Sequence, residues 1–487
     1  MKITSLTIGG FKGIKNKATI PLAPITLFFG ANSTGKSTVL HALLYLYEVV
    51  AKRNFDAQYS SITGEALYFG GFHNLVHGKQ LDGVITLGAT LDFRDGASDI
   101  WDDYLSDSER FFLENSLMLT PDAETDVFTF EIDIRWDRQK QRAFVSRYEC
   151  SSHRIKFFQI ETKQGMPNSQ ISHYQPLPHW EVEDEFKIEN LFPSGEWKNI
   201  TIEIQDSLPR IDKRLDLSDS TLQWETKVAL PIDSMLFIEA ALSQATLAPL
   251  KLLAKKLNDL IHIGPLRIVP TRSTVLNKKS NSDRWYDGTA GWETFAFAKM
   301  ALHDSVNKKF NSPEFFNAGY QFQPVTYGEE PQSEKRVELT EVNTGIKLTP
   351  TNVGIGISQV FPFVVATSID KELLVSCEQP ELHIHPKWQL SLADMMLEAV
   401  HNNPDRMFFI ESHSEHILLR LLKRRRQTAD EEISYLPFGC KKQDVQIIFC
   451  EQQKGQTKLI PIKTTDEGEF DAPWPNGFFE ERGEELF

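Results

Sequence analysis

Hydrophobic and polar residues follow two different rhythms along this chain of 487 residues. Short apolar runs, at 25–29, 373–377 and 407–410, stand close before stretches whose apolar residues recur at helical spacing. This order predicts buried strands followed by helices. Residues 126–136 instead alternate apolar and polar side chains, which predicts a strand with one buried face. The apolar positions of that stretch are Phe128, Phe130, Ile132, Ile134 and Trp136.

Strands that alternate with helices favour an α/β fold with a largely parallel sheet. Because the alternation occupies both ends of the chain, we expect the middle to be a β-rich insertion with a helical connection after it. Acidic residues outnumber basic ones over 181–240, so this insertion is either a solvated lobe or a surface for a partner. The expected parts are 1–94 (first part of the α/β domain), 95–233 (insertion), 234–340 (helical connection), 341–452 (second part) and 453–487 (tail).

The most specific pattern is GANSTGKST at 30–38, which fits G-x-x-x-x-G-K-[ST] between an apolar run and a helical stretch. Its glycines allow successive backbone N–H groups to turn inward around phosphates, and the following helix N-terminus adds favourable partial charge. We expect Lys36 to reach the β/γ-phosphates and Ser37 to bind Mg²⁺. The predicted ATP-binding residues here are Gly30, Asn32, Ser33, Thr34, Gly35, Lys36, Ser37 and Thr38.

A second pattern, LLVSCEQPELHIHP at 373–386, is an apolar run that ends in an acidic residue. Beside a complete phosphate loop, Glu378 is predicted to bind Mg²⁺. Gln379 follows, where ATPases of this general type often have a glutamate; its amide can orient a water but cannot take its proton. Either hydrolysis is slow, or another group assists, or the residue is a replacement. Glu381, His383 and His385 are equally consistent with structural and chemical roles.

Two further segments are candidates for phosphate contact. His413 follows the apolar run at 407–410, where a side chain can face the γ-phosphate; Ser412 and Ser414 beside it are suited to capping a helix. NVGIGISQ at 352–359 contains Gly354 and Gly356, which free the backbone, and Ser358, which offers hydroxyl and N–H groups. Alone, this second segment is also consistent with an ordinary turn.

Composition narrows the setting. The net charge of −15 predicts no global attraction to nucleic acid or to anionic membranes. Four cysteines without framework spacing indicate reduced thiols, and the absence of a long apolar stretch or secretory leader predicts a cytoplasmic protein. One basic run could contact phosphates or could complement a helix dipole. It comprises Arg420, Lys423, Arg424, Arg425 and Arg426.

Together these segments resemble the ABC-type ATPase heads of the OLD-like and RecF-like families. Within them the chain looks most like the stand-alone ATPases of prokaryotic antiphage defence. The segments that carry the resemblance are GANSTGKST, HIGPLR, NVGIGISQ, EQPELHIHP, ESHSEH and the tail DEGEFDAPWPNGFFEE at 466–481, with Trp474, Pro475, Gly477, Phe478 and Phe479. No such segment covers 95–230, and the signature at 352–359 differs from the LSGGQ form of transporters.

The resemblance implies an ABC-type P-loop head that pairs with a second copy around ATP. Gly354, Gly356 and Ser358 would then act in trans on ATP held by the partner's loop, with Glu378 as the Mg²⁺ carboxylate and His413 as the switch histidine. No TOPRIM nuclease is expected in the chain, so a separate effector, a nuclease or toxin, would act. The main alternative is a RecF-like DNA-repair ATPase that clamps DNA; a transporter ATPase and a non-hydrolysing ATP-binding protein are the others.

Overall fold

The structure is a computed structural model. It describes residues 1–94, 104–116, 126–163, 169–174, 200–202, 206–216, 232–271, 276, 282–329, 333–431 and 438–475. By its internal contacts the chain divides into two compact units. The first comprises 1–21, 45–58 and 69–258, and the second comprises 22–44, 59–68 and 259–487. The predicted aromatic tail residues after Pro475 lie outside the described residues.

A six-stranded sheet forms the centre of the second unit and confirms the predicted α/β class. Its order is β12 (Leu260–Ile263), β16 (Leu374–Glu378), β17 (Met407–Glu411), β3 (Ile25–Phe29), β18 (Val445–Gln453) and β19 (Gln456–Ile462). Only β19 runs antiparallel to its neighbour. Strands β3, β16 and β17 are buried along their whole length, because helices enclose a parallel sheet and leave no polar face.

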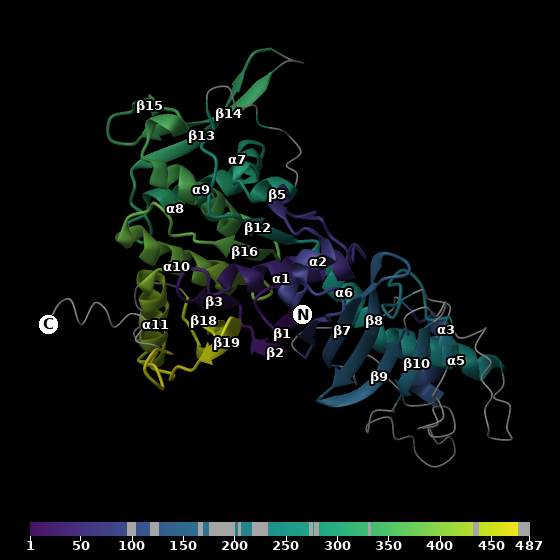
Figure 1. Cartoon of the computed structure of the whole chain (residues 1–487). Coiled ribbons are helices and arrows are strands. Elements are labelled where there is room, and N and C mark those ends of the chain that lie inside the picture. Colours follow the sequence, from purple (N-terminus) through teal and green to yellow (C-terminus); the bar gives the residue numbers. More distant parts are fainter. Residues whose placement is uncertain are drawn as a thin grey trace. The chain divides into compact units, whose positions relative to one another are not determined.

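Helices follow the parallel strands, as the sequence predicts. They are α1 (Lys36–Val50) after β3, α10 (Pro386–Asn402) after β16 and α11 (Glu415–Ala429) after β17, while α9 (Ile355–Ser368) precedes β16. Helices α10 and α11 contact each other and are adjacent in Figure 1. Because β3, β16 and β17 run parallel, their carboxyl ends meet at one edge of the sheet, where ligands bind in open α/β folds.

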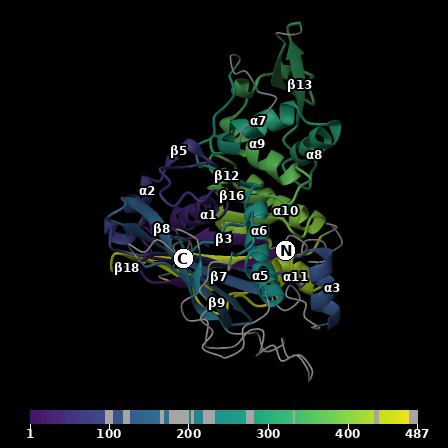
Figure 2. The same cartoon turned by 90° about the vertical axis from the view of Figure 1, so that its right-hand side faces the viewer.

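The same unit carries a smaller antiparallel sheet of β13 (Tyr320–Tyr327), β14 (Glu334–Glu341) and β15 (Lys347–Leu348). It lies beside α7 (Thr289–Ala296), α8 (Met300–Asn311) and α9, as Figures 1 and 2 show. An aromatic cluster joins these elements, because their buried rings pack against one another in stacked, tilted and edge-on contacts. Its members are Trp292, Phe295, Phe310, Phe322 and Phe361. A short hairpin, β4 (Tyr59–Ser60) and β5 (Gly64–Tyr68), completes the described strands of this unit.

An eight-stranded antiparallel sheet forms the first unit. Its order is β11 (Ile200–Ile202), β10 (Ser169–Tyr174), β9 (Ile155–Glu161), β8 (Arg142–Ser152), β7 (Val127–Asp137), β6 (Ile85–Asp92), β1 (Lys2–Gly9) and β2 (Ala18–Pro21). Strand β7 buries every second residue over most of its length, as its alternating sequence predicts. This sheet includes strands from both sides of the expected boundary at residue 94, because β6 and β7 pair along eight residues of each strand.

Short helices complete the first unit: α2 (Gly71–Leu75), α3 (Asp107–Ser116), α5 (Ile232–Thr246) and α6 (Ala248–Leu257). The Tyr148 hydroxyl donates to the Thr246 carbonyl over 2.7 Å, which ties β8 to α5. Among the described residues, no helix is both long and apolar enough to cross a bilayer.

Candidate nucleotide site

The segment that fits the phosphate-loop pattern lies between β3 and α1. Gly30 (φ 147°) and Gly35 (φ 97°) have backbone conformations that other residues rarely adopt. A Cβ atom at Gly30 would come within 2.3 Å of the Cys450 carbonyl oxygen, so the turn also requires glycine for space. Lys36 is buried inside the turn, and its ammonium donates to the carbonyls of Gly30 (3.1 Å) and Ala31 (2.8 Å).

The remaining loop residues differ in exposure. Asn32 and Ser33 are exposed, and Ser33 has a positive φ of 61°. Thr34 is buried and donates to the Ala31 carbonyl over 2.9 Å, which fixes the turn. Ser37 and Thr38 lie in the first turn of α1 and are half-buried. The loop therefore presents exposed backbone at its tip and charged or hydroxyl side chains at its base.

Two carboxylates stand at the ends of neighbouring parallel strands. Glu378 ends β16 and Glu411 ends β17, and the two residues are paired in register. The Ser37 hydroxyl donates to Glu411 Oε2 over 2.6 Å, and Lys36 Nζ lies 4.0 Å from Glu411 Oε1. Sequence reasoning predicted Glu378 here but did not identify Glu411. Its signal is an acidic residue at the end of an apolar strand, immediately before the Ser-His pair.

Two histidines contact Glu378, and neither was predicted. His262, on β12, is fully buried; its Nε2 lies 3.2 Å from Glu378 Oε1 and its Nδ1 lies 2.9 Å from the Ser376 hydroxyl. His41, on α1, places Nε2 3.7 Å from the same carboxylate oxygen. The parallel order of β12 and β16 brings His262 and Ser376 side by side.

Burial and hydrogen bonds shift these two carboxyl groups in opposite directions. Burial alone would raise the pKa of Glu378, but hydrogen bonds from His262 and His41 lower it to about 2. Burial raises the pKa of Glu411 to about 7, although the Ser37 hydroxyl opposes the shift, and the neighbouring Glu378 raises it further. Burial lowers the pKa of the Lys36 ammonium, and Glu411 opposes that shift. Such perturbed groups at strand ends are typical of functional sites.

Gln379 and His413 lie next to these carboxylates along the chain. Gln379 has a positive φ of 44°, and its N–H donates to the Glu411 carbonyl over 2.8 Å. The His413 N–H donates to Glu381 Oε1 over 2.7 Å, and burial lowers the pKa of the His413 imidazole. Ser414 caps α11 by accepting from the Ile417 N–H. Glu381 thus holds the backbone at the start of the His413 turn, a role that the sequence left open.

Arg267 joins the segment at 352–359 to the end of β16. The Arg267 guanidinium donates to the carbonyls of Glu378 (2.7 Å) and Gln379 (3.1 Å). The backbone N–H of Arg267 donates to Gln359 Oε1 (3.2 Å). Arg267 is nearly fully buried. The HIGPLR segment, which contains Arg267, carried part of the family resemblance, but the sequence predicted no role for this arginine.

The glycines and serine of that segment have different surroundings. Gly354 is exposed, with open space where a Cβ would lie, whereas a Cβ at Gly356 would approach the His383 carbonyl oxygen to 2.7 Å. Ser358 is fully buried, and its hydroxyl donates to the Pro350 carbonyl over 3.2 Å. Gly354 and Ile355 are therefore the exposed backbone at the start of α9.

The donor set suits Mg²⁺. The Ser37 hydroxyl and the carboxylates of Glu378 and Glu411 are hard oxygen ligands, the kind that Mg²⁺ prefers. Within the described ranges, no group of three or more His, Cys, Asp or Glu side chains is arranged to hold a metal by itself. Mg²⁺ in nucleotide sites is usually held by one or two protein groups together with phosphates and water, so this small set fits.

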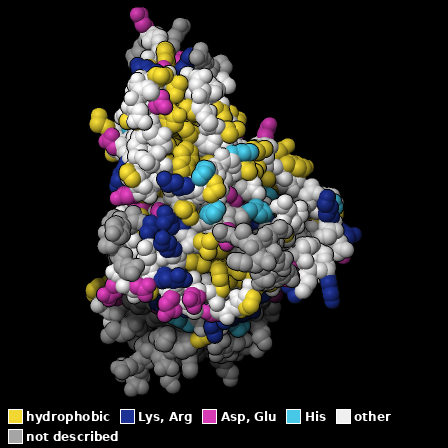
Figure 3. Space-filling model, turned by 90° about the vertical axis from the view of Figure 1, so that its left-hand side faces the viewer, with side chains coloured by type: hydrophobic (Ala, Val, Ile, Leu, Met, Phe, Trp, Pro, Cys, Tyr) yellow, Lys and Arg dark blue, Asp and Glu magenta, His cyan; other side chains and the backbone are white. Residues whose placement is uncertain are grey.

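The basic run on α11 is largely internal. Arg424 donates through Nε and Nη2 to Asp394 (2.7 and 3.0 Å), and Arg420 Nε lies 3.1 Å from the same carboxylate. Arg425 is buried and donates to the Lys442 carbonyl over 3.2 Å. On the face seen in Figure 3, described Lys and Arg side chains gather at mid-height, above a row of acidic ones. Three of the five cations therefore bind neighbouring elements of the same unit.

Comparison with known families supports this reading of the site. A model described as "AAA ATPase domain" matches residues 1–227, and one described as "AAA domain, putative AbiEii toxin, Type IV TA system" matches 273–419. A third, "Protein of unknown function (DUF3696)", matches 440–487. Two of the three matching models thus describe AAA ATPase domains, and each covers less than half of the chain. No curated protein sequence matches the chain significantly.

Solved structures with some likeness are heads of SMC proteins. An SMC head bound to the C-terminal winged-helix domain of ScpA is 11% identical and has a TM-score of 0.43, with 95% of this chain and 98% of that chain covered. The SMC head domain from Thermotoga maritima is 9% identical and has a TM-score of 0.37, with 95% of this chain and 100% of that chain covered. A third structure is an SMC head domain with an extended coiled coil, bound to the C-terminal domain of ScpA derived from Pyrococcus furiosus. It is 11% identical and has a TM-score of 0.40, with 95% of this chain and 96% of that chain covered.

Proposed function

We propose that this chain binds ATP with Mg²⁺ at the loop of residues 30–38. The observation that carries the proposal is the 2.6 Å bond between the Ser37 hydroxyl and Glu411, whose strand neighbour is Glu378. This bond brings the base of a phosphate loop against the carboxyl ends of two buried parallel strands. The AAA ATPase match over residues 1–227 supports the same nucleotide class.

In this proposal each residue has a separate task. The phosphate-loop backbone and Lys36 bind the β/γ-phosphates, and Ser37 and Glu378 hold Mg²⁺, which supplies positive charge to those phosphates. His262 and His41 orient Glu378 through its Oε1 atom. His413 would contact the γ-phosphate, and Gln379 would orient a water by hydrogen bonding. Because the Gln379 amide cannot accept a proton, hydrolysis at this site is expected to be slow.

We further propose that two copies pair around ATP and control a separate effector in prokaryotic antiphage defence. Gly354 and Ile355 are exposed at the start of α9 and so are accessible to nucleotide bound by a second copy. The model that matches 273–419 is described as a putative toxin of a type IV toxin–antitoxin system, which supports a role in a system with a toxic output. ATP would then act as a ligand that favours the paired state.

The RecF-like alternative, a clamp on DNA, has less support. DNA binding at physiological salt requires several Lys or Arg side chains that can reach phosphates. Arg420, Arg424 and Arg425 instead bind groups of the same unit. Salt-sensitive, ATP-dependent DNA binding by the purified protein would favour this alternative over an effector scaffold.

The test measures ATP affinity by calorimetry and assembly mass by mass photometry, with and without Mg²⁺. Lys36→Ala should weaken ATP binding about 10- to 100-fold, because it removes charge-assisted hydrogen bonds to phosphate. It should also abolish ATP-dependent pairing. Lys458→Ala is the matched control, because Lys458 is an exposed lysine on β19 of the same unit. Equal ATP affinity in wild type and Lys36→Ala would refute the site, and an unchanged mass with bound ATP would refute the pairing.

A further inference from the structure

Arg267 lies between the start of α9 and the loop that follows β16. Its side chain is almost fully buried. Within the described residues, its guanidinium donates to backbone carbonyls and to the Cys377 sulfur, and to no carboxylate. Two of these carbonyls belong to Glu378, the last residue of β16, and to Gln379, which follows it. A buried cation that has no carboxylate beside it is costly, so we expect Arg267 to have a role beyond packing.

The backbone of Gln379 is held in a conformation that it would not favour by itself. Its φ of 44° lies in the left-handed region, which is unfavourable for a residue with a side chain and persists only where the surroundings enforce it. The Gln379 N–H donates to the Glu411 carbonyl over 2.8 Å, and the Gln379 carbonyl accepts from Arg267 over 3.1 Å. These two bonds fix the peptide groups on both sides of the Gln379 Cα, and therefore the direction of its side chain.

Arg267 is also bonded to α9. Its backbone N–H donates to Gln359 Oε1 over 3.2 Å, and Gln359 Nε2 donates back to the Arg267 carbonyl over 2.5 Å. Gln359 is buried and lies about one helical turn after Ile355, the first residue of α9. Because the two bonds are reciprocal, a movement of the first turn of α9 is passed to Arg267.

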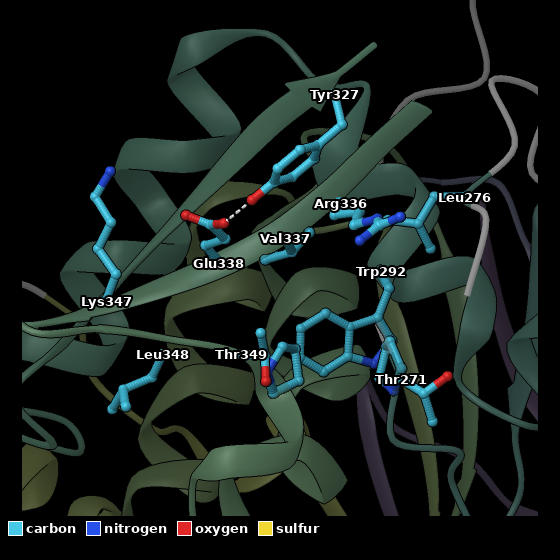
Figure 4. Close-up of a pocket in the computed structure, with 12 residues that line it drawn as sticks. Thr271, Leu276, Trp292, Tyr327, Arg336, Val337, Glu338, Lys347, Leu348 and Thr349 are labelled. Carbon is cyan, nitrogen blue, oxygen red and sulfur yellow. Dashed lines mark hydrogen bonds between the residues drawn. The ribbon is translucent and has the colours of Figure 1, made fainter. Parts of the chain in front are cut away.

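The rest of α9 is enclosed, and its start is the exposed part. Residues 357–367 of the helix are all buried. Pro350, just before the helix, accepts from the Ser358 hydroxyl over 3.2 Å. Pro350 and Trp292 also line a cavity of about 360 Å³, which Figure 4 shows, so the turn before α9 has space on one side. Because close-packed interiors transmit displacement, we expect a contact at Ile355 to move the start of α9 as one body.

We propose that Arg267 is a positioning residue that makes ATP turnover depend on the pairing of two copies. This inference rests on the proposed function. ATP held by a second copy contacts the start of α9 at Ile355, and α9 positions Arg267 through Gln359. Arg267 in turn positions the backbone of Gln379, which orients the attacking water. A chain therefore hydrolyses its own ATP fastest when its α9 contacts the ATP of a partner.

The test compares Arg267→Lys with Arg406→Lys. Lysine keeps the charge but cannot reach several carbonyls at once, because it lacks the planar fork of arginine. Arg406 is the matched control, because it is equally buried and donates to the carbonyls of Thr367 and Lys371 at the opposite end of α9. Phosphate release, ATP affinity and assembly mass are measured across chain concentrations at which the wild type passes from single copies to pairs.

We expect turnover per wild-type chain to rise about tenfold or more as pairs form, because catalysis is sensitive to small misplacements. Arg267→Lys should bind ATP and pair like the wild type, yet its turnover should stay near the unpaired rate. Arg406→Lys should reproduce the wild-type rise. A full rise in Arg267→Lys, or a wild-type turnover that does not change with pairing, would overturn the inference and leave ATP binding and pairing intact. A wild type that does not bind ATP or does not pair would refute the proposed function, and this inference with it.

A second variant keeps the test valid if Arg267→Lys folds poorly. Gln359→Met removes both bonds between the Gln359 side chain and the Arg267 backbone and leaves the guanidinium in place. Circular dichroism and urea unfolding show whether each variant is folded. Folded Gln359→Met should bind ATP and pair normally, and its turnover should stay near the unpaired rate. A wild-type rise of turnover in Gln359→Met would contradict the route from α9 through Arg267 to Gln379.

Discussion

The two large sheets place their charged residues differently. In the parallel sheet, Glu378 and Glu411 are buried at the ends of adjacent strands. In the antiparallel sheet, Arg147 lies among Glu131, Asp133 and Glu149, and all four side chains keep between 16% and 22% of their surface exposed. The Arg147 cluster gives each carboxylate a permanent cation, whereas Glu378 contacts histidines and Glu411 contacts a hydroxyl and a distant lysine.

This difference indicates where chemistry is to be sought. Burying a carboxylate without a close cation is costly, so such groups persist mainly where a ligand uses them. In the partly exposed Arg147 network each carboxylate has a cation that offsets the cost of burial, so the network contributes modestly to stability. We therefore expect the parallel sheet to carry the proposed function, and the antiparallel sheet to respond to mutation in its stability alone.

The largest expected effect is on the stability of the antiparallel sheet. Phe130 is fully buried on β7 and stacks on Phe128, with ring centroids 6.2 Å apart. Phe130→Ala should lower the free energy of unfolding by about 3–5 kcal/mol, because it removes a buried ring and leaves a cavity. Urea unfolding followed by circular dichroism measures this loss, and calorimetry of the folded variant should give an unchanged ATP affinity.

The control for this prediction is Phe111→Ala on α3. Phe111 is 68% exposed, so its removal should change the unfolding free energy by less than about 0.5 kcal/mol. If folded Phe130→Ala bound ATP several-fold more weakly, the antiparallel sheet would take part in the nucleotide site, and the contrast between the sheets would fail.

A smaller effect is expected on turnover at the parallel sheet. Gln379→Glu introduces a carboxylate next to Glu378, where it can accept a proton from water. General-base catalysis contributes about 10²- to 10⁴-fold, so we expect ATP turnover to rise at least about tenfold. A coupled phosphate-release assay measures the rate. Gln321→Glu, at an exposed position on β13, makes the same change outside the site and should have no effect. A turnover unchanged by Gln379→Glu would show that another group already accepts the proton.

Local sequence patterns were sufficient to predict the parallel core and the segments that flank the site. Apolar runs gave β3, β16 and β17, and the phosphate-loop pattern gave the turn before α1. The contacts of Ser37 with Glu411 and of Glu378 with His262 could not be predicted. These pairs are separated by 374 and 116 positions, and they meet only because the sheet order places β17 beside β3 and β12 beside β16.

Strand β12 is a second feature that local sequence patterns could not predict. Residues 260–263 are only four positions long and follow a helical stretch closely, so no strand pattern stands out there. Their parallel pairing with β16 supplies the missing information, and it also brings Arg267 to the backbone of Glu378. The cavity beside Trp292 likewise depends on packing between α7 and β14, which no local pattern encodes.

The smallest expected effect is on the free energy of unfolding, through an ion pair of the first unit, which contains the antiparallel sheet. Glu109 accepts two hydrogen bonds from Arg214, at 2.8 and 2.5 Å, and also bonds Ser106 at the start of α3. The Arg214 hydrogen bonds lower the pKa of Glu109 to about 2. The folded state therefore resists protonation of this carboxyl more than the unfolded state does. Its stabilising contribution is complete above the unfolded pKa of about 4.5 and is lost as the pH falls toward 2.

Glu109→Gln should accordingly lower the unfolding free energy by about 1 kcal/mol at pH 7, a value that allows for screening by solvent, and by less at pH 3. Urea unfolding at both pH values measures the difference. Glu114→Gln, on the same helix, removes an exposed pair with Arg110 at 3.7 Å and should have almost no effect at either pH. ATP affinity should stay constant in both variants. If Glu109→Gln instead altered ATP binding while Glu114→Gln did not, a well-paired carboxylate of the antiparallel unit would influence the nucleotide site, and burial without a cation would no longer distinguish functional from structural charge in this chain.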